Sequence, residues 1–119
     1  MLKTCYEVRT ARSSDLTEIL QLTSTENFEL KCSLIIKSIR NNSMNLTIMK
    51  YQKELIGLAM SGTFVGEEVS LMYLLISSYH RDHGFGKMIL KENLEFWKRR
   101  GAMRCLLELR ESNKGTVNP

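Results

Sequence analysis

The chain has 119 residues, a mass of 13.8 kDa and a formal net charge of +4, with a sequence pI of about 9.1. This length predicts a single domain, residues 1–119, with one hydrophobic core. The mild positive charge suits an anionic ligand, but acidic residues are interspersed with the basic ones, so we expect no nucleic-acid partner.

Cysteine usage and hydropathy predict a cytoplasmic protein. The three cysteines are far apart and have neither zinc-site nor C-x-x-C spacing, which favours reduced thiols. No apolar run is long enough for a membrane span, and the first residues lack a signal sequence. His80 and His83 lie three residues apart without a nearby carboxylate cluster, so we expect no metal site.

The first half of the chain begins with a strand over residues 5–10 and continues with two helices. The first helix starts near Ser13–Asp15, where Asp15 and Glu18 have capping-box spacing, and Leu16, Ile19 and Leu20 mark its apolar face. The second helix spans residues 29–40, with apolar pairs four residues apart.

The second half changes to strand periodicity and then returns to one helix. Residues 44–51, 54–65 and 69–77 predict a three-stranded meander. A helix over residues 87–100 buries a stripe of Ile89, Leu90, Leu94 and Trp97, and residues 102–110 form a last strand. The order βαα-βββ-αβ predicts a mixed sheet with a parallel strand–helix–strand crossover.

The stretch RDHGFGKMIL, residues 81–90, joins an apolar strand to this helix. Arg81 and Met88 break the Walker pattern, and Ile89 breaks the Rossmann pattern. Glycines at a helix start let backbone N–H groups approach an anion, so the junction predicts a phosphate site. The alternative is a plain tight turn.

The remaining pattern, R-x-x-G-x-G, resembles motif A of the GNAT N-acetyltransferases, [Q/R]-x-x-G-x-[G/A]. The segment KRRGAMRCLLELRESN, residues 98–113, resembles the ribosomal-protein-alanine (RimI-like) branch of that family, and RTARSSDLTEILQL resembles its first strand and helix. The resemblance implies an α/β acyl-CoA N-acyltransferase fold with a mixed central sheet flanked by helices. It also implies that this chain lacks the family's last helix and strands.

Cofactor and site residues follow from the same resemblance. Acetyl-CoA or CoA is implied as the cofactor. The backbone of Leu74, Leu75 and Ile76 would contact the acetyl and pantetheine portion. The pyrophosphate loop would comprise Arg81, Asp82, His83, Gly84, Phe85, Gly86 and Lys87, and Asn113 would also contact the cofactor.

The implied reaction is transfer of acetyl to a protein N-terminal α-amine, with the N-terminal alanine of a ribosomal protein as the branch's substrate. Glu108 corresponds to the family's general base; its residue type alone favours a surface ion pair with Arg110 or Lys87. The family's tyrosine acid has no counterpart here. A small-molecule amine, a lysine side chain, or a CoA-binding module with little catalysis remain alternatives.

We also expect a homodimer. In the family the strand at residues 102–110 gains a neighbour from a C-terminal hairpin, which this sequence lacks. An open strand edge favours pairing with a second copy of the chain, so residues 102–119 are the expected interface.

Overall fold

The computed structural model describes residues 6–63, 68–100 and 104–107. Its strands are β1 (Tyr6–Thr10), β2 (Met44–Tyr51), β3 (Glu54–Thr63), β4 (Glu68–Ile76) and β5 (Arg104–Leu107). Its α-helices are α1 (Leu16–Thr25), α2 (Cys32–Arg40) and α3 (Phe85–Lys98). Short 3-10 turns at Ser13–Asp15 and Ser78–His80 precede α1 and α3. This is the βαα-βββ-αβ order predicted from the sequence.

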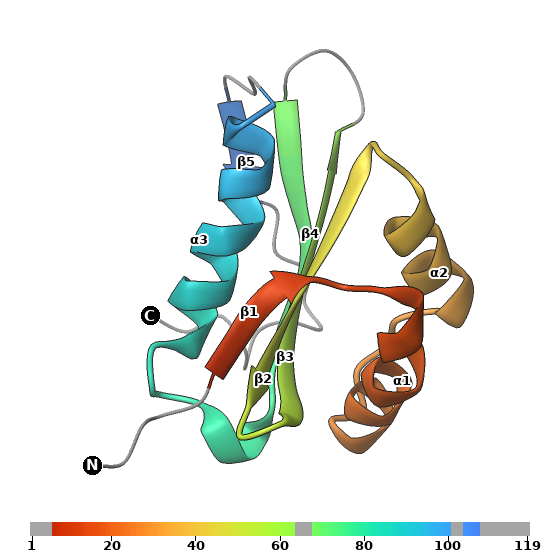
Figure 1. Ribbon diagram of the computed structural model, residues 1–119, viewed down its shortest axis with the longest axis vertical. Coiled ribbons are helices and arrows are strands. Elements are labelled where there is room, and N and C mark those ends of the chain that lie inside the picture. The colour runs from red at the N-terminus through yellow and green to blue at the C-terminus, as the bar shows by residue number, and fades with distance from the viewer. Residues whose placement is uncertain (1–5, 64–67, 101–103, 108–119) are drawn as a thin grey trace.

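The strands form one sheet in the order β1-β2-β3-β4-β5 (Figure 1). The first four strands are antiparallel, and β5 lies parallel to β4 after the α3 crossover. In the described residues, Arg104–Leu107 pair with Glu68–Leu71, at the beginning of β4. The mixed sheet and its parallel crossover are therefore confirmed.

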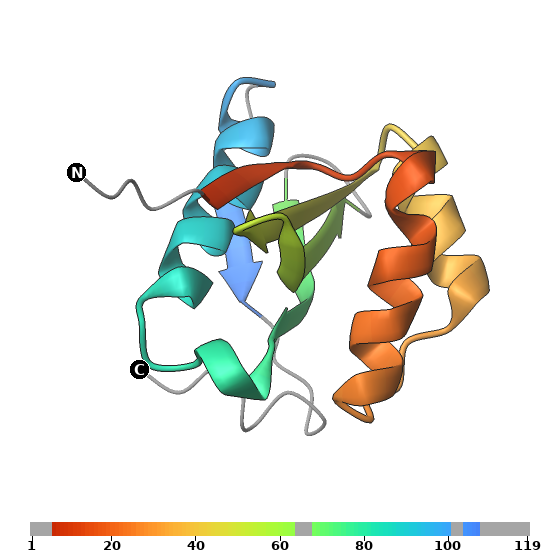
Figure 2. The same cartoon turned by 60° about the horizontal axis from the view of Figure 1, so that its bottom comes forward.

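Helices cover both faces of the sheet. Figures 1 and 2 show α1 and α2 on one face and α3 on the other. The α1/α2 face buries a cluster that includes Ile19, Ile35, Leu46, Ile48, Leu58, Met60 and Leu75. The α3 face buries a second cluster of Met49, Ile56, Ala59, Leu71, Leu74, Ile76, Phe85 and Ile89. Burial on both faces explains why the meander reads as nearly continuous apolar runs.

A β-bulge interrupts the alternation of side chains in β4. Met60 of β3 pairs with Tyr73, but the next residue, Ser61, pairs with Leu71, which leaves Met72 as the extra residue. Met72 and Tyr73 consequently both pack toward the α1/α2 cluster. Bulges increase local strand twist and are common beside active sites.

Asp15 stabilises the corner between β1 and α1. Its carboxylate accepts hydrogen bonds from two Arg9 nitrogens, at 2.8 and 3.0 Å, and from the Arg12 backbone N–H at 2.7 Å. These hydrogen bonds, led by those from Arg9, lower the pKa of Asp15 to about 2. The expected pairing of Asp15 with Glu18 in a capping box is wrong, since Glu18 instead accepts from Lys50 Nζ at 3.0 Å.

The helix boundaries also differ from the predicted ones. The second helix begins at Cys32 rather than at residue 29, because the chain from Phe28 first crosses toward the sheet and packs against Tyr73. The helix α3 begins at Phe85 rather than at Lys87, since the Phe85 ring is buried against the sheet. No helix within the described parts of the chain has the length and apolar character that a membrane crossing requires.

Candidate active site

The end of β4 and the start of α3 are joined by a short, tightly folded connection. The strand stops at Ile76, one 3-10 turn follows at Ser78–His80, and α3 begins at Phe85. The connection thus places a strand end and a helix N-terminus next to each other.

Two residues of this connection have left-handed backbone. Asp82 has φ 67° and Gly84, the N-cap of α3, has φ 78°. Aspartate tolerates this region better than most residues, and glycine adopts it without steric cost. A β-carbon at Gly84 would have no atom within 4 Å, so the space beside it is open. A tight turn explains the two φ angles, but the open space also leaves room for a ligand.

The first turn of α3 begins at this space, and its first N–H groups make no helical hydrogen bond among the described residues. The first helical hydrogen bond runs from Met88 N–H to Gly84 O at 3.3 Å, so the N–H groups of Phe85, Gly86 and Lys87 precede it. Such groups, with the helix dipole, attract anions. Lys87 is exposed and adds a positive charge. The described residues therefore fit a pyrophosphate group.

Gly86 lies over the end of β4. Its missing β-carbon would contact Ile76 Cγ1 and Leu74 Cδ2, both at 4.0 Å. These distances are ordinary van der Waals contacts, so a methyl group fits there, whereas the additional carbons of a branched side chain would crowd the helix start against the end of β4.

Arg81 binds protein groups on two sides of the connection. Its Nε donates to Ile76 O at 3.3 Å, and its Nη2 lies 3.3 Å from Glu26 Oε1. The Glu26 side chain is 6% exposed and also accepts from Ser78 Oγ at 3.1 Å. Arg81 thus connects the end of α1 to the end of β4 through its side chain.

Aromatic rings surround Phe85 and fix the first turn of α3. Tyr6, Tyr51 and His83 each place a ring centroid 5.6 Å from that of Phe85, and His80 lies at 6.5 Å. His83 is exposed and His80 half-buried. Among the described residues, no group of three His, Cys, Asp or Glu side chains could hold a metal ion.

The segment Leu74–Ile76, whose backbone is predicted to contact the acetyl and pantetheine portion of the cofactor, is buried. It runs directly into the connection. Leu74 and Ile76 face α3, whereas Leu75 faces α1 and α2. The segment follows the β4 bulge and lies beyond the four residues whose pairing with β5 is described. The structure therefore brings Leu74–Ile76 and the loop 81–87 together, as the sequence predicted.

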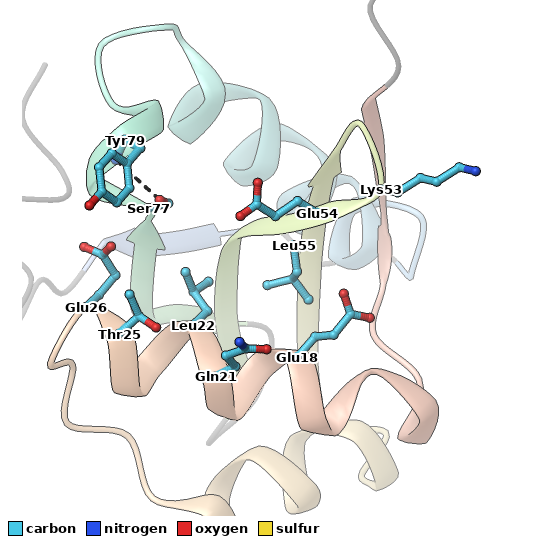
Figure 3. A pocket seen from close by; sticks show the side chains of 10 residues that line it. All are labelled: Glu18, Gln21, Leu22, Thr25, Glu26, Lys53, Glu54, Leu55, Ser77 and Tyr79. Carbon is cyan, nitrogen blue, oxygen red and sulfur yellow. Dashed lines mark hydrogen bonds between the residues drawn. The ribbon is translucent and has the colours of Figure 1, made fainter.

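A pocket of about 410 Å³ opens beside this connection, on the α1 side (Figure 3). It is lined by Glu18, Gln21, Leu22, Thr25 and Glu26 of α1 and its end, by Lys53, Glu54 and Leu55 of the β2–β3 turn and β3, and by Ser77 and Tyr79. Glu18 and Glu26 lie toward opposite ends, but each is paired, with Lys50 and Arg81 respectively. Because these pairs offset much of the acidic charge, the lining does not define one class of ligand.

Two of the predicted site residues lie outside the described part of the chain. Glu108 and Asn113 follow Leu107, the last described residue of β5. Sequence reasoning missed two described residues that bear on the site: Glu26, which contacts Arg81, and Asn93, which is fully buried about two turns further along α3. Glu26 and Arg81 are 55 residues apart, and no local pattern indicates such a pair.

Comparison with known families decides the classification. A sequence profile described as the Acetyltransferase (GNAT) family matches residues 7–118. The chain belongs to the GNAT acetyltransferase family. Among curated protein sequences, no match to it was found.

Solved structures of acetyltransferases share this fold. The aminoglycoside N-acetyltransferase AAC(6')-Iy in complex with CoA has a TM-score of 0.79 at 12% identity, over 97% of this chain and 84% of that chain. The ribosomal-protein-S18-alanine N-acetyltransferase from Escherichia coli has a TM-score of 0.78 at 15% identity, over 95% and 72%. The ribosomal-protein-alanine N-acetyltransferase from Brucella melitensis biovar Abortus 2308 has a TM-score of 0.76 at 11% identity, over 93% and 85%. At these identities the likeness shows the fold.

The family membership confirms three predictions made from the sequence resemblance. The chain has the α/β GNAT fold, it is an N-acetyltransferase, and its acetyl donor is acetyl-CoA. The acceptor amine is a separate question, because the GNAT fold is common to protein and aminoglycoside acetyltransferases.

Proposed function

We propose that this GNAT acetyltransferase transfers the acetyl group of acetyl-CoA to a protein N-terminal α-amine, with the N-terminal alanine of a ribosomal protein as the first candidate. The observation that carries the cofactor site is the α3 N-terminus, where the N–H groups of Phe85, Gly86 and Lys87 precede the first helical hydrogen bond and the N-cap, Gly84, borders open space. The acceptor assignment is supported by the RimI-like segment at residues 98–113 and by two solved structures of ribosomal-protein-alanine N-acetyltransferases.

The cofactor would lie along the end of β4 and across the connection. The backbone of Leu74–Ile76 would contact the acetyl and pantetheine portion, since this segment precedes the loop directly. The pyrophosphate would accept hydrogen bonds from the first-turn N–H groups. Asp82 and Gly84 contribute left-handed backbone to this loop, and Lys87 contributes a cation. Asn113 is proposed as a further contact from its sequence position alone.

The Arg81 side chain has a different role in this proposal. It already bonds to Ile76 O and Glu26, so we assign the guanidinium to holding the loop while its backbone continues the phosphate-binding turn.

Proton removal is assigned to Glu108. Attack on a thioester needs a neutral amine, but an α-amino group has a pKa of about 7.7–8.0 and is largely protonated at neutral pH. A carboxylate near the acceptor, directly or through one water, can take the proton. The proposal for Glu108 comes from the LLELRESN segment.

A small-molecule amine is the second candidate acceptor. The aminoglycoside acetyltransferase has a TM-score of 0.79, about equal to the 0.78 of the Escherichia coli protein acetyltransferase. A turnover assay should therefore offer both an alanine-initiated ribosomal peptide and an aminoglycoside. Preferential acetylation of the peptide supports the proposal, and acetylation of the aminoglycoside alone contradicts it.

The cofactor site is tested with a graded series at Gly86. Gly86→Ala should retain CoA affinity, because the family motif accepts alanine and a methyl group fits the space. Gly86→Val should abolish CoA binding in calorimetry while leaving the fold largely intact. Met88→Val is the matched control, since it introduces the same β-branched residue at an exposed position of the same helix. Unchanged affinity in Gly86→Val would contradict the pyrophosphate site.

The expected homodimer stays a prediction. Only Arg104–Leu107 of the expected interface, residues 102–119, are described. Light scattering at high micromolar concentration distinguishes a dimer from a monomer of 13.8 kDa.

A further inference from the structure

In the part of the chain that the structure describes, the side chain of Asn93 makes several polar contacts between α3 and the sheet. It has 0% exposure and lies on the inner face of the helix. Its Nδ2 lies 3.3 Å from Asn45 O, 3.0 Å from Thr47 Oγ1 and 3.1 Å from Ala59 O. In return, the Asn45 side-chain Nδ2 donates to Asn93 O at 3.2 Å. One side chain of α3 is thereby bonded to both β2 and β3.

Ser61 and Trp97 extend this network along the helix. The Ser61 hydroxyl donates to Asn93 Oδ1, and Trp97 Nε1 donates to Ser61 Oγ at 2.7 Å. A hydroxyl has one hydrogen, so donation to Asn93 leaves its oxygen free to accept from the indole. The chain of bonds from Trp97 through Ser61 to Asn93 is consistent at every donor and acceptor. All three residues are buried.

These contacts do more than add stability, because they are directional. Apolar packing is non-directional and changes gradually when a helix shifts along a sheet. Hydrogen bonds weaken steeply with distance and angle, and each donor or acceptor left unpaired in the core costs about 1–3 kcal/mol. Asn45 Oδ1 has no hydrogen-bond partner among the described residues. The buried hydrogen bonds of Asn93, Ser61 and Trp97 nevertheless specify one axial position of α3 against β2 and β3.

The position of α3 at Asn93 also determines the position of its first turn at the candidate site. Asn93 follows Phe85 by eight residues in one continuous helix, which corresponds to about 12 Å along its axis. A shift of α3 at Asn93 moves the first-turn N–H groups by a similar amount. The other wall of the site, the end of β4, is held in the sheet by its pairing with β3, so a shift of α3 along the sheet changes the position of the N–H groups relative to β4.

We infer that Asn93 is a positioning residue for the cofactor pyrophosphate: it sets the axial position of α3, and so the place of the N–H groups of Phe85, Gly86 and Lys87 relative to β4. This inference rests on the proposed function of the loop. Asn93 acts through the helix and does not touch the cofactor.

The test compares two probes that differ in the pyrophosphate. Wild type and Asn93→Leu are titrated with CoA and with acetyl-pantetheine, which lacks the pyrophosphate and the nucleotide, using NMR for the weaker ligand. A misplacement of about 1 Å can cost up to a hundredfold in a positioned interaction. We expect the CoA dissociation constant to rise at least tenfold and that of acetyl-pantetheine to change less than twofold.

Two control variants separate positioning from stability. Ile35→Ala lowers stability through α2, which packs on the opposite face of the sheet, and should leave the ratio of the two dissociation constants unchanged. Trp97→Phe removes only the hydrogen bond from Trp97 Nε1 to Ser61 Oγ and should raise the CoA dissociation constant by about threefold. If Asn93→Leu does not fold, Trp97→Phe takes its place in the test.

The outcomes are distinct. The positioning role is overturned if the dissociation constants of CoA and acetyl-pantetheine rise by the same factor. It is also overturned if their ratio is unchanged in both Asn93→Leu and Trp97→Phe. In either case the CoA site itself is not contradicted. Failure of the wild type to bind CoA refutes the proposed loop function, and the inference with it.

Discussion

Gly84 and Gly86 allow the same chemical change at two positions with opposite expected effects on stability. Gly84 has φ 78°, and an added β-carbon would meet no atom within 4 Å. The cost of Gly84→Ala is therefore conformational rather than steric, and left-handed backbone costs an L-residue roughly 1–2 kcal/mol.

Gly86 lies inside α3, and its β-carbon would make only ordinary contacts at 4.0 Å. Alanine is the better helix former by up to about 1 kcal/mol, and by less near a helix end. Gly86→Ala should therefore be neutral or stabilising. The two variants should differ by about 2 kcal/mol.

Thermal unfolding measures this difference. About 1 kcal/mol shifts Tm by roughly 4 °C in a domain of this size, so Gly84→Ala should melt about 8 °C below Gly86→Ala. Urea unfolding with unchanged m-values would show that both variants keep the same native fold. A Gly84→Ala protein as stable as Gly86→Ala would refute the left-handed start of α3, and with it the placement of the N–H groups.

Three further outcomes are expected. Glu108→Gln should lower turnover, most strongly below the pKa of the acceptor amine, without weakening CoA binding; an equally active variant in a steady-state assay would remove its role as base. Glu26→Gln breaks a buried partner of the loop and should cost about 1–2 kcal/mol in urea unfolding and weaken CoA binding, whereas the exposed Glu29→Gln should change neither. The pKa of Asp15 is lowered from 3.8 to about 2. The charged carboxylate therefore stabilises the folded state at neutral pH by about 2 kcal/mol. This contribution is lost as pH falls from about 5 toward 2, because the carboxylate becomes protonated. Asp15→Asn should remove that part of the acid dependence, and urea midpoints at pH 7 and pH 3 check it.

The sequence predicted the fold because its patterns are local. The pattern of each of these features depends on neighbouring residues: the apolar strand runs within 44–77, the helical stripe containing Ile89 and Trp97, and the glycine junction. Each element is present. The helix starts were shifted because contacts from distant segments decide them. Phe85 is drawn into α3 by rings from β1 and the end of β2, which the local pattern around residues 84–87 does not contain.

The candidate site was only partly predictable, for a related reason. Glycine spacing indicated the phosphate loop, since conformational demands appear directly in the residue type. Long-range polar pairs give no such signal: Asn93 interrupts an apolar stripe and reads as a surface residue, although it is fully buried. The Glu26–Arg81 pair likewise depends on the fold that brings α1 beside the connection.

The strand order β1-β2-β3-β4-β5 bears on how the protein acquires its activity during synthesis. Each strand pairs with its predecessor in the chain, so the sheet can grow in the order in which it leaves the ribosome, with modest loop-closure cost at each step. Among the described residues, the α1/α2 core contains none beyond Leu75, whereas the opposite core is closed by α3. In a nascent chain the α1/α2 core can therefore form before the anion-binding end of α3 is in place. Acetyl-CoA would bind only after α3 and β5 have packed against the sheet.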